Sequence, residues 1–242
     1  MENLDALLRK LLGRRAALAL LGAGSAVALG LHARRVLAQS AGGLPACIVR
    51  PEQTEGPFFV EEKLERSDIR ADPGSGVAKA GVPLRVTFRV SRVQGGTCRP
   101  LAGAQVHVWH CDAAGAYSDV RDMRGSTVGQ KFLRGYQTTD ANGVATFTTI
   151  YPGWYYGRAV HIHFKVRTAE QLKRGREFTS QMYFDDALSD RVFAQAPYAA
   201  RGRRDARNDE DGLFRRGGKQ LVIALEEDGA GYAGTFDVGL TA

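Results

Sequence analysis

The chain has 242 residues, which suffice for one domain with a sizeable hydrophobic core or for two small domains. It carries 33 basic and 26 acidic side chains, of which 6 basic and 2 acidic ones lie in the first 38 residues. The rest of the chain has a formal charge of +3, which is too low to indicate a nucleic-acid-binding protein.

Residues 1–38 have the pattern of an export signal peptide. Arg14 and Arg15 precede an uncharged apolar run, 16–31, and the small-residue end at 36–38 is a candidate cleavage site. The run is shorter than the about 20 residues that a membrane-spanning helix needs. Paired arginines favour the twin-arginine export route. We therefore expect an exported protein, periplasmic or extracellular, without stable membrane insertion once the signal is removed.

Three cysteines follow the signal: Cys47, Cys98 and Cys111. In an oxidising compartment, one disulfide and one thiol is the simplest arrangement of an odd number. All three pairings are open on the sequence. No C-x-x-C pair occurs, so a zinc site is not indicated.

Residues 39–75 are predicted to form an extended N-terminal arm in front of a domain at 76–242. Pro51, Gly56 and Pro57 suit neither a helix nor a central strand. The two phenylalanines that follow can pack on the domain and cover the mouth of a site.

Short strands separated by turns dominate the domain. Apolar and polar side chains alternate from Leu84 to Val93, which predicts a strand with one buried face. Residues 140–143 are typical of a hairpin turn. The strands flanking this turn and the remaining strands are predicted at 104–110, 136–139, 144–150, 159–166, 179–184, 220–225 and 235–240.

The strand pattern indicates an all-β fold, with an antiparallel β-sandwich core and long loops. A short helix is expected at 186–195. The loops at 118–131 and 196–219 are long for a compact domain, and such loops usually have a function.

The sharpest local feature is His161-Ile162-His163. In a strand, residues two apart point to the same face, so the two imidazoles project together. Two neighbouring nitrogen ligands suit iron, copper or zinc. Alone, the pattern also fits a surface pair of histidines, or one core histidine with a neighbour.

Nearby tyrosines strengthen the prediction that these histidines bind a metal. Tyr151, Tyr155 and Tyr156 lie just upstream, and Tyr117 follows the strand at 104–110. Phenolate is a hard oxygen ligand that favours ferric over ferrous iron. No carboxylate flanks the histidine pair, which argues against the ferrous site of two histidines and one carboxylate.

These residues belong to a series of motifs that together resemble the intradiol ring-cleavage dioxygenases, the family of protocatechuate 3,4-dioxygenase and catechol 1,2-dioxygenase. The chain is most similar to the exported, single-chain branch of that family. The resemblance extends from about Pro51 to Phe184. It is carried by residues 54–58, 109–112 with 115–117, 139–143, 149–155, 158–163 and 181–184.

The resemblance implies a non-haem Fe(III) centre. Tyr117 corresponds to the equatorial tyrosinate, Tyr155 to the axial one, and His161 and His163 to the two imidazole ligands. Tyr151 and Tyr156 remain alternatives to Tyr155 because they are so close to it in sequence.

Further residues are implied around the iron. Arg158 matches the family's active-site arginine, and Gln181 matches a glutamine near the substrate. His107 and His110 are candidates for contacts behind the ligands, and we expect at most one of them near the iron. Gly157 stands where protocatechuate enzymes have a bulky aromatic residue, so the choice of catechol is open.

The expected activity is cleavage of a catechol-type ring by O2 between the two hydroxylated carbons, giving a muconate-type dicarboxylate. The chain can be a monomer or a homo-oligomer. The alternative is a secreted, non-catalytic β-sandwich module that binds a metal or an aromatic ligand. Such a module has no reason to hold two tyrosines, two histidines and Arg158 together.

Overall fold

The computed structural model describes residues 48–122, 125–169, 173 and 177–241. The predicted export signal and Cys47 lie outside these residues. The described part is mostly strands, and none of its helices is long and apolar enough to cross a membrane. The strands are β1 (Pro83–Gln94), β2 (Thr97–Pro100), β3 (Gln105–Trp109), β4 (Arg121–Asp122), β5 (Gly125–Ser126), β6 (Arg134–Thr138), β7 (Val144–Ile150), β8 (His161–Arg167), β9 (Phe178–Tyr183), β10 (Glu226–Asp228) and β11 (Gly231–Thr241).

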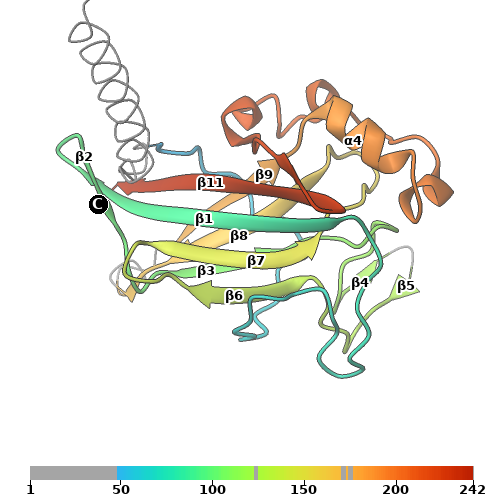
Figure 1. The fold of residues 1–242 in the computed structure, drawn as a ribbon, viewed down its shortest axis with the longest axis horizontal. Coiled ribbons are helices and arrows are strands. Elements are labelled where there is room, and N and C mark those ends of the chain that lie inside the picture. Colours follow the sequence, from blue (N-terminus) through green and yellow to red (C-terminus); the bar gives the residue numbers. More distant parts are fainter. Residues whose placement is uncertain (1–47, 123–124, 170–172, 174–176, 242) are drawn as a thin grey trace, which may run out of the picture. The chain divides into compact units, whose positions relative to one another are not determined.

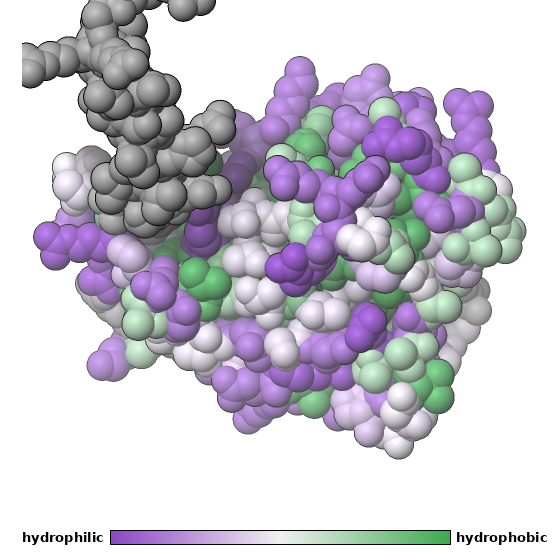
Figure 2. Space-filling model, in the orientation of Figure 1, coloured by the Kyte–Doolittle hydropathy of each residue, from purple (hydrophilic) through white to green (hydrophobic). Residues whose placement is uncertain are grey.

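Two larger sheets contain most of the strands (Figure 1). The first has the order β10-β11-β1-β2, with β7 also paired to β1, and the second has the order β6-β3-β8-β9. β4 and β5 form a separate two-stranded sheet. On the face in Figure 2, hydrophobic side chains are scattered among polar ones.

The pairing of β1 with β11 is parallel, from Leu84 opposite Tyr232 to Val93 opposite Thr241. The prediction of an antiparallel core is therefore wrong for this pair. Parallel neighbours need a long connection, and nearly the whole domain lies between these two strands. Alternation of side chains reports which face is buried but not the direction of the neighbouring strand.

The inner faces of the two sheets share one core. Leu84, Val86 and Phe88 of β1 are buried, as the alternation predicted. Phe88 contacts Phe164 of β8, with ring centroids 5.4 Å apart, and Phe164 contacts Phe236 of β11 at 5.5 Å. Full burial of one such side chain contributes about 1.5–3 kcal/mol to folding.

The predicted strand at 220–225 is wrong as a ladder strand. A 3-10 helix, η3 (Gly218–Leu221), comes first, and Val222 then forms a single bridge with Tyr183. Leu221 and Ile223 are nevertheless buried. The alternation therefore identified the buried side chains correctly, although the segment does not pair as a strand.

The predicted helix at 186–195 is present as α4 (Asp186–Phe193), and the Asp185 side chain accepts the Leu188 N–H at its N-cap. The long segment after it contains the short 3-10 helices η1 (Tyr198–Arg201) and η2 (Asn208–Glu210).

Residues 51–65 cover the outer face of the second sheet. Gln53 N–H donates to Thr179 O of β9 at 3.0 Å, Ser180 Oγ donates to Pro51 O at 2.7 Å, and Tyr136 N–H donates to Leu64 O at 2.8 Å. We call this segment the covering segment. Because it lies on this face, β8 is buried on both sides from His161 to Val166.

The disulfide chemistry is partly defined. Cys98 takes part in a disulfide, whereas Cys111 is a buried thiol whose Sγ lies 3.4 Å from Gly153 O. Both pairings that involve Cys111 are therefore excluded. The remaining alternative pairs Cys98 with Cys47, which lies outside the described residues.

Candidate metal centre

Tyr117, Tyr155, His161 and His163 converge on the outer face of the second sheet. The two histidine Nε2 atoms are 3.0 Å apart, and Tyr155 Oη is 3.1 Å from His161 Nε2. The Tyr117 ring lies 5.6 Å from the Tyr155 ring and 6.2 Å from the His163 ring. The structure therefore brings these four side chains together.

The strand ladder of the second sheet explains the position of His163. Trp109 of β3 is opposite both Arg134 of β6 and His163 of β8, and His163 is opposite Gln181 of β9. These four residues form one row across the sheet. The Trp109 and His163 rings are stacked, with centroids 5.1 Å apart and planes at 8°.

A tight turn at Asp112 positions Tyr117. Asp112 Oδ1 accepts the N–H groups of Ala114 and Ala116 at 3.0 and 2.9 Å, an Asx-type arrangement. Gly153 passes so close to this turn that a Cβ there would lie 2.4 Å from Asp112 O. Only glycine fits this crossing, which brings the loops of Tyr117 and Tyr155 together.

The histidines present lone pairs to the centre. His161 Nδ1 lies 2.7 Å from Ala159 O, so its N–H donates there and Nε2 is left as an acceptor or ligand. Burial lowers the pKa of both histidines well below the usual range, with further lowering by Arg158, so both are neutral at pH 7. Neutral imidazole is the form that binds metals.

The spacing of the donor atoms suits one ion. Two ligand atoms at about 2.1 Å from a common metal and at right angles lie about 3.0 Å apart. The separations of 3.0 and 3.1 Å match this value. Among the described residues, His, Cys, Asp and Glu side chains form no group of three that could hold a metal. The tyrosines are therefore the donors available to complete the set.

The phenols need a strong cation to ionise. Burial, then the neighbouring Tyr155, raises the pKa of Tyr117 well above its usual value, and burial raises the pKa of Tyr155 to about 12. The Tyr117 hydroxyl is buried without a well-aligned hydrogen-bond partner in the described chain. A bound metal ion reverses this balance, because its charge favours the phenolate. The donor set thus fits a highly charged, hard ion such as Fe(III).

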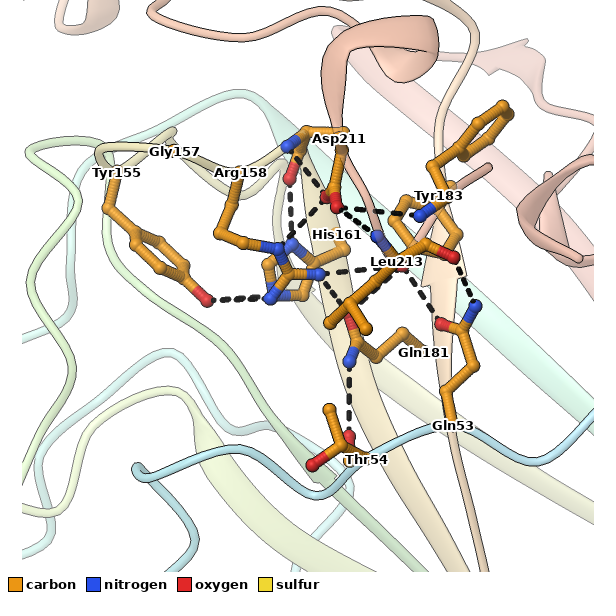
Figure 3. Close-up of polar contacts among 12 residues, drawn as sticks. Gln53, Thr54, Tyr155, Gly157, Arg158, His161, Gln181, Tyr183, Asp211 and Leu213 are labelled. Carbon is orange, nitrogen blue, oxygen red and sulfur yellow. Dashed lines mark hydrogen bonds and ion pairs between the residues drawn. The ribbon is translucent and has the colours of Figure 1, made fainter. Parts of the chain in front are cut away.

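Arg158 lies beside Tyr155 in a network of polar contacts (Figure 3). Its Nη1 donates to Tyr155 Oη at 3.2 Å, its Nη2 donates to Gln181 Oε1, and its Nε donates to Asp211 Oδ2 at 2.9 Å. Burial alone would lower the pKa of Arg158, but Tyr155 and Asp211 raise it overall. The guanidinium is therefore a fixed positive charge at the centre.

Asp211 holds the arginine and was missed by the sequence analysis. It is 1% exposed, and its carboxylate also accepts the N–H groups of Ala159 at 3.0 Å and Leu213 at 2.7 Å. The only indication in the sequence was that Asp211 lies in the loop at 196–219, whose length predicted that it has a function.

The covering segment also contacts the centre. Phe58 stacks on Tyr117 with ring centroids 4.4 Å apart, and a Cβ on Gly56 would lie 3.2 Å from His163 Cε1. Gln181 Nε2 donates to Thr54 O at 3.0 Å. The sequence motifs include these residues, but the motifs did not predict which atoms they contact.

The alternatives to Tyr155 lie elsewhere. Tyr151 is fully buried and its hydroxyl lies 2.8 Å from Ser189 Oγ of α4, whereas Tyr156 is 84% exposed. Gly157 is exposed, and a Cβ there would meet no atom within 4 Å. A side chain at this position would therefore project into open space.

Of the two further histidines, His110 is the one that adds to the lowering of the pKa of His161 and His163, after burial and other neighbours. His110 Nε2 lies 2.7 Å from Thr149 Oγ1. His107 instead stacks on Tyr136, with centroids 5.0 Å apart.

Comparisons with known proteins find dioxygenases. A family model described as "Dioxygenase" matches residues 54–211. Over 159 residues the chain is 34% identical to the protocatechuate 3,4-dioxygenase beta chain of Burkholderia cepacia, covering 61% of this chain and 66% of that one. Over 103 residues it is 36% identical to a catechol 1,2-dioxygenase of Candida albicans, covering 41% and 31%. The chain thus spans less than two thirds of the length of these curated relatives.

Solved structures cover more of the chain. An intradiol ring-cleavage dioxygenase from Tetranychus urticae superposes with a TM-score of 0.69 at 32% identity, covering 81% of this chain and 95% of that one. The dioxygenase domain of a dioxygenase carbohydrate-binding protein fusion from Streptomyces sp. SirexAA-E gives 0.56 at 31% identity, covering 80% and 99%.

Proposed function

Because the chain belongs to the intradiol ring-cleavage dioxygenase family, we propose that it cleaves catechol-type rings with O2 between the two hydroxylated carbons, giving muconate-type dicarboxylates. Non-haem Fe(III) would be held by Tyr117, Tyr155, His161 and His163. The observation that carries the proposal is the convergence of two phenols and two neutral imidazoles beside a fixed guanidinium. We also infer that the two packed sheets form a β-sandwich.

Bound Fe(III) would act as a Lewis acid that binds and orients both catechol oxygens and makes the ring reactive towards O2. The protein's own groups then have separable tasks, which follow from their burial and contacts.

The two tyrosines differ in how firmly they are held. Tyr117 is 1% exposed and lies under Phe58, so it is suited to remain in place. Tyr155 is half-buried and its hydroxyl lies 3.2 Å from Arg158 Nη1. Burial in the folded, metal-free protein raises the pKa of Tyr155 to about 12, above the ordinary phenol value near 10. A Tyr155 phenolate that gives way to the substrate would therefore take a proton from a substrate hydroxyl. Arg158 would retain the Tyr155 hydroxyl after it gives way to the substrate.

Arg158 also provides electrostatic stabilisation. Asp211 and Gln181 fix its guanidinium before substrate arrives, so no reorganisation is needed when negative charge develops on the substrate. Preorganised donors of this kind contribute about 3 kcal/mol to lowering a barrier. The covering segment, which lies on His163 and Tyr117, would exclude water from the reacting ring.

Isotope labelling tests the reaction. The iron-loaded chain is incubated with catechol under heavy-oxygen gas, and the product is analysed by mass spectrometry. We expect a dicarboxylate that contains both labelled oxygen atoms. A ring-cleavage product bearing an aldehyde, or unchanged catechol in the presence of bound iron, would contradict the proposal. The non-catalytic binding module is not favoured, because it does not account for Arg158 and its supporting carboxylate.

We further propose that residues 1–38 direct export by the twin-arginine route, supported by Arg14, Arg15 and the apolar run after them. Replacing both arginines by lysine should keep the protein in the cytoplasm, as measured by cell fractionation. Export of that variant at the unchanged rate would contradict this route.

A further inference from the structure

A small cavity lies next to Trp109, on the side away from His163. In the ladder of the second sheet, His163 is on one side of Trp109 and Arg134 is on the other. The cavity has a volume of about 20 Å³ and opens between the covering segment and strands β3 and β6. It is lined among others by Glu62, His107, Trp109 and Arg134.

Each of these four side chains has one buried polar atom without a hydrogen-bond partner in the described chain. The atoms are Glu62 Oε1, His107 Nε2, Trp109 Nε1 and Arg134 Nη1. His107, Trp109 and Arg134 are only 6%, 1% and 3% exposed. Buried polar groups in native proteins nearly always have partners, so four such atoms around one cavity indicate a common ligand.

The other polar atoms of Glu62 and Arg134 are already engaged. Glu62 Oε2 pairs with Lys131 Nζ at 2.6 Å, and Arg134 Nε donates to Ser118 Oγ at 2.7 Å. Arg134 Nη2 donates to Phe58 O at 3.3 Å. Glu62 and Arg134 are thus held in place, and each keeps one buried atom without a partner beside the cavity.

The donors and acceptors define the ligand. Trp109 Nε1 and Arg134 Nη1 can only donate, and Glu62 Oε1 as a carboxylate can only accept. Burial lowers the pKa of His107 to about 4, so its ring is neutral at pH 7 and its Nε2 can do either. The positive charges of Arg134 and Lys131 are offset by the carboxylates of Glu62 and Asp119, so the ligand is neutral.

We propose that this cavity is a binding site for one water molecule, which links the covering segment to strands β3 and β6. A cavity needs about 10–15 Å³ and two to four polar partners to hold a water, and this one meets both conditions. Water accepts from Trp109 and Arg134 and donates to Glu62, with His107 as the fourth partner.

The water has a structural consequence for the candidate metal centre. The Trp109 ring stacks on His163, and its N–H is the group that the water accepts. The water therefore fixes the indole plane against a candidate metal ligand, as buried partners behind ligating histidines commonly do.

The site can be tested without iron or substrate, so the test is independent of the proposed function. A crystal structure of the full chain that resolves ordered solvent should show a peak within hydrogen-bond distance of Trp109 Nε1 and at least two of the other atoms. In solution, the Trp109 indole N–H should show magnetisation transfer from water with the sign of a long-lived bound molecule. The chain has two tryptophans, so Trp154→Phe identifies the signal.

Trp109→Phe is the matched variant, because it keeps an aromatic ring against His163 and removes the N–H donor together with the five-membered ring that carries it. We expect it to weaken or abolish the solvent peak, whereas Trp154→Phe, whose ring packs on Arg201 at 4.1 Å, should leave it unchanged. A direct ion pair between Arg134 and Glu62 that closes the cavity would overturn the proposal. So would wild-type protein with no solvent peak, or an indole signal without transfer from water.

Discussion

Replacing Asp211 by asparagine tests whether the position of Arg158 depends on a carboxylate that the sequence did not reveal. The pair is well buried, with side chains 17% and 1% exposed and Nε 2.9 Å from Oδ2. Exposed ion pairs contribute at most about 1 kcal/mol, but hydrogen bonds to charged groups in buried sites contribute about 1.5–3 kcal/mol.

The size of the expected effect depends on which contacts of Asp211 the asparagine keeps. Arg158 and the Ala159 N–H both donate to Oδ2, whereas the Leu213 N–H donates to Oδ1. Asparagine keeps one acceptor oxygen, which can take the place of Oδ2 or of Oδ1 but not both, and it has lost the charge. We expect the free energy of unfolding to fall by about 2 kcal/mol. Arg158 keeps its contacts with Gln181 and Tyr155 but is less firmly fixed. Losing half of an electrostatic contribution of about 3–4 kcal/mol lowers kcat about ten- to thirtyfold.

The assay is O2 consumption by iron-loaded protein, with urea unfolding measured in parallel. Iron content should be unchanged, and kcat should fall more than KM changes. Asp209→Asn is the matched control, because this residue is exposed and lies two positions earlier in the same loop. If Asp211→Asn and Asp209→Asn had the same kcat and stability, the claim that Asp211 positions Arg158 would be refuted.

Three further predictions concern the scaffold. Gly153→Ala should lower the free energy of unfolding by about 1–3 kcal/mol, measured by urea unfolding, because its Cβ would lie 2.4 Å from Asp112 O; unchanged stability would contradict the close crossing. Burial lowers the pKa of His107 and His110 from 6.5 to about 4, so the folded apoprotein binds fewer protons than the unfolded chain. Its stability should be complete above pH 6.5 and fall as the pH drops towards about 4, and a flat Tm over this range would contradict their burial. Lys165→Met should speed proteolysis of the covering segment, because this buried ammonium pairs with a glutamate of that segment; an unchanged cleavage rate would show that the pair does not hold it.

Local patterns predicted the parts of the site that lie on strands. The alternation of β8 was enough to place His161 and His163 on one face, because strand geometry fixes the direction of every second side chain. Tyr117 and Tyr155 come from loops, where no periodicity exists, and their roles came only from the family resemblance. Asp211 meets Arg158 through a loop that begins far downstream, and no local pattern encodes that contact.

The fold, like the site, could be predicted in part from the sequence. Alternation identified the buried side of β1, since Leu84, Val86 and Phe88 share the core face. It could not reveal that β11 runs parallel to β1, because a buried face is the same for either direction of a neighbour. Nor could it show that both faces of β8 are buried, since the cover comes from residues 51–65, which form no ladder of their own.

The visible absorption spectrum of the iron-loaded chain, before and after anaerobic addition of catechol, tests the central claim most directly. If Tyr117 and Tyr155 ligate Fe(III), the protein will show a tyrosinate-to-iron charge-transfer band that moves to longer wavelength when catechol binds. Tyr156→Phe should leave that band unchanged, because Tyr156 is 84% exposed. A colourless protein with stoichiometric bound iron would contradict the tyrosine ligands and, with them, the proposed centre.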